Sequence, residues 1–464
     1  DEAHEFADNA RSGLSTEVSF AAAQKELLSI ITIMTSLMDT QHHMTFSMDF
    51  TPYEAAMDNM VLIAQRVRRD PLVLDDLVDA AELRQTIMEA GLKLNSLYSI
   101  MREWLQMCSM KRSQVEEEDP MDDASLEDAD DQQHGAALRL AFNELINTLK
   151  YSANTNATHI ITLEARGQDT VIVATPASLV IGGLKLQSLE PLPDETKPLF
   201  VLTSGTLIGC GDNKIAHLEY DYGTMLSGDG GPKIVEIKSP FDYRAQSACF
   251  YPNSPKLNPK LPPSAYYPAL CACVEDLLEI TNGFALVLVT SYTAMNELKA
   301  GVVWPGQLIC QSDYHNASEA TAAYLHAADM AMDVPGSPGP VLVGAQSFWR
   351  GVSIEGPRLV QVIIPKMDFQ VPTDPLVKLR GASDDNYFMN GSVQYAYTQM
   401  AQGVGRLIRT VNDYGIISIL DPRLRGSKWG LLIWKRLVCS SRYTDNIDLI
   451  KQAFQKMKEK YGDG

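Results

Sequence analysis

Apolar residues recur at intervals of three and four positions through most of residues 16–150, as in VSFAAAQKELLSIITIMTSLMDT and ELRQTIMEAGLKLNSLYSIMREWLQMCSM. This spacing places the apolar side chains on one face of an α-helix. A further amphipathic stretch, AALRLAFNELINTLKYSA, ends the segment. We therefore expect a helical domain, and we interpret its methionine-rich stripes as packed core rather than as cofactor contacts.

At about residue 158 the apolar period shortens to two, and THIITLEARGQDTVIVATP predicts two strands around a glycine-containing turn. The run PLFVLTSGTL ends in small and hydroxyl residues, which is typical of a buried parallel strand that delivers a functional loop. From about residue 233, apolar segments alternate with loops and helices, which predicts a doubly wound parallel sheet. The expected strands are KIVEI, FALVLVTSY, GQLICQ, PVLVGAQ, LVQVIIPK and GIISILD, followed by an amphipathic helix in DNIDLIKQAFQKMKEK.

The formal net charge of −19 over 464 residues would ordinarily argue against a nucleic-acid-binding protein. About half of this charge comes from residues 116–131, which hold ten acidic residues and no basic one. Such a block is typical of a solvated loop that repels itself. Basic residues cluster elsewhere, as at Arg66, Arg68 and Arg69, so the average charge does not exclude nucleic acid.

The chain has no run of 18 or more apolar residues, so we expect no membrane span and no membrane partner. Of its seven cysteines, only Cys271 and Cys273 are close in sequence, and no second pair completes a zinc or iron–sulfur set. We therefore expect no iron–sulfur cluster in this chain. An odd, scattered set of cysteines suits buried thiols in a reducing, cytoplasmic environment.

Two short motifs carry candidate chemistry. In Asp1-Glu2-Ala3-His4, one carboxylate would hold a Mg²⁺ ion on a nucleotide and the next would orient or deprotonate the attacking water. In Gln402-Gly403-Val404-Gly405-Arg406-Leu407-Ile408-Arg409, two arginines stand three positions apart, so on a helix both guanidinium groups would project from one face. Two such cations can stabilise a phosphoryl group in transfer. The two glycines weaken a helix, which favours close backbone approach over a merely solvated helix.

With these motifs the chain resembles the DinG and XPD helicases of superfamily 2. The matching segments follow the family's order: Asp1–His4 for motif II, Thr203–Leu207 for T-S-A-T-L, Ser239–Tyr243 for the S-P-F segment, Thr290–Tyr292 for T-S-Y, Ser347–Ser353 for motif V, Gln402–Arg409 for motif VI, and Leu420–Arg423 for L-D-P-R. Motifs in one order from end to end make coincidence an inadequate explanation.

The resemblance implies an α/β fold of tandem RecA-like P-loop helicase domains, the first of them incomplete, with an inserted α-helical arch domain. On this basis residues 1–12 are a motif II remnant of the first RecA-like domain and 13–152 are the arch-like insertion. Residues 153–212 are expected to be the remainder of the first domain, and 213–464 the second. The family binds ATP between the two motor domains, and DNA crosses the top of both.

The resemblance also assigns expected roles to single residues. Catalysis falls to Glu2, Arg406 and Arg409, and Mg²⁺ to Asp1 and Glu2. The ATP-binding set is Asp1, Glu2, His4, Gly351, Gln402, Gly405, Arg406 and Arg409. Contacts with single-stranded DNA fall to Thr203, Ser204, Thr290, Ser291, Trp349, Arg350 and, on the arch, Arg66 and Arg69, with Lys111 and Arg112 as further candidates. A solvated helix face is the alternative for the arch residues, and core packing is the alternative for Trp349.

Departures from the family pattern matter as well. Arg350 and Ser353 stand where relatives usually carry Glu and Asp, and Gly205 replaces Ala. No segment reads G-x-x-x-x-G-K-[ST], the loop that cradles nucleotide phosphates. Since this loop precedes motif II in the family, we expect it upstream of Asp1 or on another chain. We also expect that the chain alone does not hydrolyse ATP.

The leading hypothesis is an ATP-dependent DNA helicase or translocase of 5′-to-3′ polarity that acts on single-stranded DNA, with DNA repair as one setting. One alternative is a CRISPR-associated DinG-like helicase that works with an RNA-guided complex. Another is a non-catalytic remnant that binds DNA or a partner. The altered motif V favours the remnant, whereas the intact motif VI argues against it.

Overall fold

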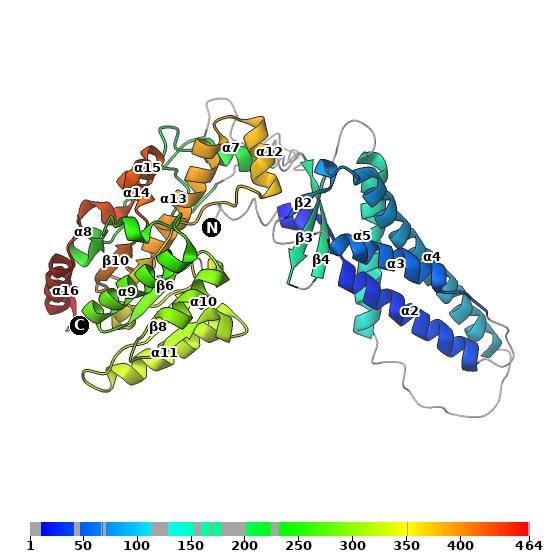
Figure 1. The fold of residues 1–464 in the computed structure, drawn as a ribbon, viewed down its shortest axis with the longest axis horizontal. Helices are drawn as coiled ribbons and strands as arrows, with labels where there is room; N and C mark the ends of the chain where they lie inside the picture. The colour runs from blue at the N-terminus through cyan, green and yellow to red at the C-terminus, as the bar shows by residue number, and fades with distance from the viewer. Residues whose placement is uncertain are drawn as a thin grey trace, which may run out of the picture.

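The computed structural model describes residues 11–40, 47–65, 67, 71–112, 129–152, 159–167, 169–177, 201–223, 232–349 and 351–462. Two bodies are evident in Figure 1. The helical body comprises the described residues from 11 to 177, and the sheet body comprises those from 201 to 462. None of the described helices is long and apolar enough to cross a membrane.

The helical body contains long helices packed beside a small antiparallel sheet. Its helices are α2 (Phe20–Thr40), α3 (Thr51–Ala64), α4 (Ala80–Arg112) and α5 (Ala129–Ser152). Its strands are β1 (Thr16–Ser19), β2 (Leu72–Val73), β3 (His159–Arg166) and β4 (Asp169–Pro176), in the order β1-β4-β3-β2. Gly167 turns β3 into β4 at φ +67°, as the glycine-containing turn predicted.

The boundary at residue 152 differs from what the sequence suggested. Strands β3 and β4 pair with β1, and Ile161, Leu163 and Ile172 share one buried core with the helices. Their apolar alternation gives them one face to bury, and the helices α2 to α5 supply the surface that covers it. The two strands therefore belong structurally to the helical body, whereas the sequence assigned residues 153–212 to a motor domain. The acidic segment 116–131 lies outside the described residues, apart from the helical backbone of 129–131.

The sheet body is built on seven parallel strands in the order β11-β5-β10-β9-β6-β8-β7. These strands are β5 (Ser247–Phe250), β6 (Ala285–Leu288), β7 (Leu308–Cys310), β8 (Val341–Gly344), β9 (Gln361–Ile364), β10 (Gly415–Ile419) and β11 (Tyr443–Thr444). This parallel seven-stranded sheet confirms the predicted α/β fold class.

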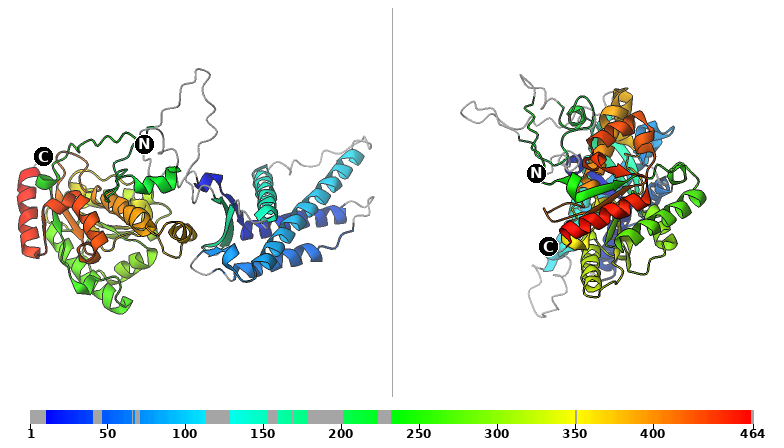
Figure 2. Two further views of the ribbon diagram at one scale, coloured as in Figure 1. Left: turned by 90° about the horizontal axis from the view of Figure 1, so that it is seen from above. Right: turned by 90° about the vertical axis from the view of Figure 1, so that its left-hand side faces the viewer.

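Helices cover both faces of this sheet, and the strands are correspondingly apolar on both. Along β6, Ala285 and Val287 face one core, while Leu286 and Leu288 face the other. The first core is completed by α9 (Pro263–Thr281), α10 (Tyr292–Gly301) and α16 (Ile447–Tyr461), and the second by α11 (Ala317–Met332), α13 (Val393–Val404) and α15 (Lys428–Arg436). Figure 2 shows α16 on the outer side of the sheet, away from the helical body. The continuous apolar runs in the sequence reflect this burial on both faces.

Two strands expected from the sequence are absent from the part of the chain that the structure describes. KIVEI has no assigned secondary structure, and Val235 is 69% and Ile237 90% exposed. The described end of PLFVLTSGTL is also unpaired, and Val201 is 73% exposed. Neither segment has a neighbouring strand among the described residues, and an apolar run alone does not form a ladder. Conversely, β5 and the two-residue β11 were not expected.

A buried ion-pair cluster joins the two bodies. Asp221, on α7 (Ala216–Tyr222), accepts hydrogen bonds at its Oδ1 from Arg11 at 3.0 Å and from Arg380 at 2.9 Å. Arg380 lies on α12 (Pro375–Ser383) and also donates to the Tyr220 carbonyl at 2.9 Å. Arg11 is 8% exposed and Arg380 is 4% exposed. One carboxylate therefore compensates two buried guanidinium charges, at the place where α7 and α12 face the helical body in Figure 1.

We expect Asp221→Ala to lower the free energy of unfolding by roughly 2–3 kcal/mol, because it leaves two buried cations without their shared anion. The measurement is urea denaturation followed by circular dichroism. Asp212→Ala, in an exposed loop nearby, is the matched control and should change stability by less than about 0.5 kcal/mol. Equal losses in the two variants would contradict the bridging role of Asp221.

Candidate functional site

The two arginines of motif VI converge on a single carbonyl group. Arg406 donates from Nη1 to the Val352 oxygen at 2.7 Å, and Arg409 donates from Nη2 to the same oxygen at 3.5 Å. The sequence predicted that both guanidinium groups project from one face of a helix, but helix α13 ends at Val404 and both arginines lie in the segment that follows. Gly403 and Gly405 at the end of the helix make this early exit inexpensive.

The turn that carries the arginines is held by Asp413, which is 2% exposed. Its Oδ2 accepts from the backbone N–H groups of Arg409 and Thr410, each at 2.7 Å, and its Oδ1 accepts from the Gly356 N–H at 3.0 Å. A carboxylate that accepts several backbone bonds fixes local geometry firmly. Asp413 therefore ties the arginine turn to the segment after motif V, a role that the sequence did not reveal.

Motif V forms a loop between β8 and the buried residues Val352 and Ile354. Gly351 adopts φ +77°, a conformation that favours glycine, and this sets the direction of the Val352 carbonyl. Just before it, Trp349 is 1% exposed and donates from Nε1 to the Val289 carbonyl at 2.9 Å. The expectation that Trp349 contacts DNA is therefore wrong, because its ring is enclosed in the core.

The Trp349 ring also explains one glycine of motif VI. A Cβ atom on Gly403 would lie 3.0 Å from ring atoms of Trp349 and 3.0 Å from Leu288 Cδ1. A side chain at this position would force the Trp349 ring or Leu288 to move by a few tenths of an ångström, so glycine suits the close approach of α13 to the ring. The close backbone approach that the sequence indicated is thus present at Gly403, and its partner is the motif V tryptophan.

The T-S-G-T-L segment lies against α13. Gln402 donates from Nε2 to the Thr206 hydroxyl at 3.4 Å, and two helical turns earlier Gln394 Oε1 accepts from the Cys210 N–H at 2.7 Å. Ser204 accepts from the Thr206 N–H at 3.2 Å, while Thr203 is exposed. The structure therefore brings Thr206 beside Gln402, and leaves Thr203 at the surface.

A groove of about 710 Å³ opens beside motifs V and VI, between their loops and α11. Its walls include Ser347, Gly351, Ser353, Gln402 and Arg406. Hydroxyl groups, a positive-φ glycine and a guanidinium are donors that suit a phosphorylated ligand. In addition, Arg409 Nε is buried with no hydrogen-bond partner among the described residues, which leaves a donor for an incoming anion. These residues fit one side of a nucleotide site.

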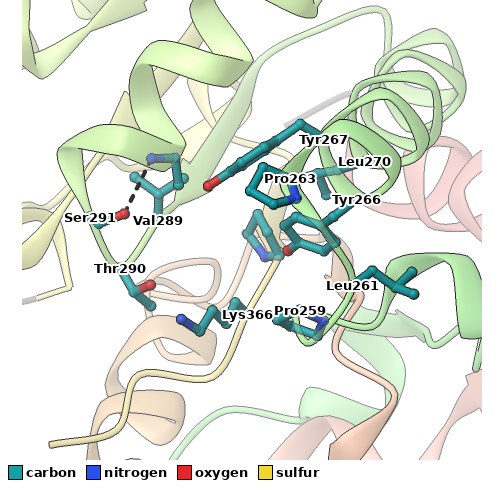
Figure 3. A pocket seen from close by; sticks show the side chains of 12 residues that line it. Pro259, Leu261, Pro263, Tyr266, Tyr267, Leu270, Val289, Thr290, Ser291 and Lys366 are labelled. Atoms are coloured by element: carbon teal, nitrogen blue, oxygen red, sulfur yellow. Dashed lines mark hydrogen bonds between the residues drawn. The ribbon is translucent and has the colours of Figure 1, made fainter. Parts of the chain in front are cut away.

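A second site lies at the carboxyl ends of two neighbouring strands. Thr290 and Ser291 follow β6, Lys366 follows β9, and β6 pairs with β9. Figure 3 shows these three residues on one side of a small pocket, with Tyr266 and Leu270 of α9 on the other. Ser291 caps α10 by accepting from the Ala294 N–H at 3.2 Å. The exposed Lys366 was missed from the sequence, although its place just after the apolar run of β9 was a usable signal.

Six sequence-predicted residues lie outside the described residues, so their expected roles stay predictions: Asp1, Glu2, His4, Arg66, Arg69 and Arg350. The same holds for Arg68 and for the side chains of Lys111 and Arg112. Among the residues that the structure describes, no group of three or more His, Cys, Asp or Glu could hold a metal ion.

The thiols of six cysteines are free: Cys210, Cys249, Cys271, Cys273, Cys310 and Cys439. Burial raises the pKa of Cys210 to about 11 and that of Cys273 to about 12. A thiol with such a pKa carries almost no thiolate at neutral pH. Burial likewise raises the pKa of Tyr243, although the nearby Arg409 opposes that shift. The chemistry of the described site therefore rests on arginine, lysine and hydroxyl groups.

Comparison with known proteins matches this picture. The profile of the family described as "Helicase C-terminal domain" matches residues 274–438. The chain is 31% identical over 272 residues to "ATP-dependent DNA helicase YoaA" of Escherichia coli. The matched stretch covers 56% of this chain and 40% of that protein. The chain is 28% identical over 273 residues to "3'-5' exonuclease DinG" of Bacillus subtilis, covering 55% and 28% respectively. The chain thus spans less than half the length of these relatives.

Solved structures show the same fold. An XPD helicase structure matches with a TM-score of 0.52 at 14% identity, covering 96% of this chain and 67% of that one. S. tokodaii Xpd4 matches with a TM-score of 0.50 at 14% identity, covering 92% and 71%. At this identity the likeness concerns the fold alone.

We expect Trp349→Ala to lower the free energy of unfolding by about 3–5 kcal/mol, because it removes a large buried ring and a buried hydrogen bond. Urea denaturation measures the loss. Tyr292→Ala is the control, since Tyr292 is 54% exposed and its removal should cost less than about 0.5 kcal/mol. A stable Trp349→Ala protein that had lost only its affinity for DNA would contradict the packing role.

Proposed function

We propose that this chain, a DinG/XPD-like member of helicase superfamily 2, supplies the DNA-tracking and arginine-bearing part of an ATP-dependent DNA helicase. The observation that carries the proposal is the convergence of Arg406 and Arg409 on the Val352 carbonyl, directly after the loop that Trp349 anchors. YoaA and DinG relatives are named as ATP-dependent helicases, which supports the activity class.

On the nucleotide side, Arg406 and Arg409 would face the phosphates of ATP. The Val352 carbonyl and the Asp413 carboxylate hold the turn before any ligand arrives, so the cations need little reorganisation. ATP with Mg²⁺ would supply the reacting phosphoryl group, and Arg406 and Arg409 would stabilise its developing charge. A change at this site would reach Thr206 of the T-S-G-T-L segment through its hydrogen bond with Gln402.

On the DNA side, Thr290, Ser291 and Lys366 would hold phosphates of a single strand. A hydroxyl, the start of helix α10 and a lysine are common phosphate contacts, and none of them distinguishes one base from another. Binding should therefore be electrostatic in part and tolerant of sequence.

Coupling between the two sides would pass through Trp349. Its indole hydrogen-bonds the residue that precedes Thr290, while its chain neighbours lead into Gly351 and Val352. Because packed cores shift between discrete arrangements rather than deforming smoothly, a change at the arginine site would be felt at the DNA site.

The domain division is part of the proposal. We assign the described residues from 11 to 177 to an arch-like insertion, and those from 232 to 462 to the second motor domain. A 5′-to-3′ polarity follows from resemblance alone and is testable by strand displacement on substrates with a single 5′ or 3′ tail. The RNA-guided partner has no support among the relatives named above, so we do not propose it.

In a protein that carries this chain together with a phosphate-binding loop, Arg409→Ala should reduce DNA-stimulated ATP turnover on the order of 10³-fold, and Arg406→Ala should also impair it. The reason is loss of charge stabilisation at the phosphoryl group. Steady-state ATPase assays with and without single-stranded DNA measure the effect. Lys456→Ala is the control, because Lys456 is exposed on α16. Full activity in the double variant would remove the basis of the proposal.

Lys366→Ala should weaken binding to single-stranded DNA and flatten its salt dependence. Loss of one phosphate contact reduces the slope of log affinity against log salt by about 0.7 for a single strand. Fluorescence anisotropy with a labelled oligonucleotide at several salt concentrations gives this slope, with Lys456→Ala again as the control. An unchanged slope would show that Lys366 makes no phosphate contact.

A further inference from the structure

A larger groove adjoins the Figure 3 pocket and shares Thr290, Ser291 and Lys366 with it. We call it the aromatic groove, because Phe369, Phe388 and Trp429 line it. Its volume is about 990 Å³, at the upper end of the range of roughly 300–1,000 Å³ that is typical of ligand pockets. A chain held at the three shared residues would therefore have open space beside it.

The three rings form one platform. Phe369 and Phe388 are parallel within 5°, with centroids 6.5 Å apart. Trp429 meets both of them edge-on, at 5.1 Å from Phe369 and 6.3 Å from Phe388. Phe388 is 48% exposed, so a large apolar ring face is left to solvent in a groove rather than in the core. Aromatic rings gathered in a groove with polar residues at its rim are typical of ligand sites.

The backbone presents Phe388 through an uncommon element. Residues Phe388–Ser392 form a π-helical turn directly before α13. Gly391 in this turn lies against Tyr387, and an added Cβ would come within 2.2 Å of the tyrosine ring. π-Helical turns are rare and occur frequently at functional sites. Phe388 is therefore displayed by a constrained turn and not by a loose loop.

Carboxylates outnumber cations among the residues that line the aromatic groove. Asp368, Asp374, Asp384 and Asp385 line it, and the hydroxyl of Tyr220 lowers the pKa of the Asp384 carboxyl. The guanidinium of Arg423 also lines the groove, but it is paired with Asp421 at 2.9 and 2.6 Å. The exposed cation of the lining is Lys366, which the groove shares with the Figure 3 pocket. A phosphate is therefore best held at Lys366, and the four carboxylates make the groove as a whole unfavourable for anions.

We propose that the aromatic groove holds unstacked nucleobases of the bound single strand, while Thr290, Ser291 and Lys366 hold the adjoining phosphates. This proposal rests on the proposed function and adds to it a contact with the bases. A nucleobase is planar and uncharged, so it suits the ring platform, and its N–H groups suit carboxylate neighbours. A strand bound in this way turns its bases into the protein and its phosphates toward Lys366.

The test combines two oligonucleotides with two variants. One oligonucleotide carries all its bases, and the other has the same backbone with abasic residues throughout its central part. Affinities of both are measured by anisotropy for the wild-type chain, for Phe388→Ala and for Trp429→Leu. Tyr443→Ala is the matched control. Tyr443 is 44% exposed on the edge strand β11 and does not line the aromatic groove.

The wild-type chain and Tyr443→Ala should bind the base-containing strand roughly tenfold more tightly than the abasic one. Phe388→Ala and Trp429→Leu should bind both strands with the lower, abasic affinity, and their circular dichroism spectra should match the wild type. Equal wild-type affinity for both strands would overturn the proposal, as would variants that keep the tenfold difference. If Lys366→Ala still lowers the salt slope in that case, the DNA track of the proposed function stands and only the base contact fails.

Discussion

The hydrogen bond from the Trp349 indole to the Val289 carbonyl, with the ring pressed on Gly403, is the contact on which the site depends. It joins the ends of β6 and β8 and sets how closely α13 can approach. Without it, the relative positions of three segments would no longer be fixed. These are the hydroxyl loop after β6, the glycine loop after β8 and the arginine turn after α13. The two loops are short and have few contacts of their own, whereas the arginine turn is held by Asp413 as well.

Helix α13 collects the remaining connections. On this helix, Gln394 accepts from the Cys210 N–H and Gln402 donates to the Thr206 hydroxyl. Gly403 lies against the Trp349 ring. The helix begins directly after the π-helical turn that displays Phe388, and it ends where the arginine turn begins. A shift of α13 along its axis would therefore move the aromatic ring, the arginines and the T-S-G-T-L segment together. This is how a buried helix can link surfaces that do not touch each other.

Much of this arrangement was predictable from local patterns. The apolar runs that became β6 to β10 are buried on both faces, so the pattern of each strand was complete within its own residues. Gly403 predicted a close backbone approach, but the sequence could not identify its partner because Trp349 lies far away along the chain. By contrast, Val201, Val235 and Ile237 are as apolar as residues of a strand, but pairing depends on a neighbour that local sequence does not contain. Phe388 and Trp429 could be recognised as neighbours only in the folded structure, because they lie on separate segments of the chain.

The exposed apolar segments around Val201 and Ile237 have a consequence for the colloidal behaviour of the chain. Backbone without a strand partner that carries exposed apolar side chains can pair with the edge of another molecule. The net charge of −19 opposes such association by mutual repulsion between molecules, and this repulsion vanishes near the isoelectric point of about 4.8. Mild acid or concentrated salt should therefore turn a dispersed preparation into a β-rich precipitate, while dilute neutral buffer keeps it in solution.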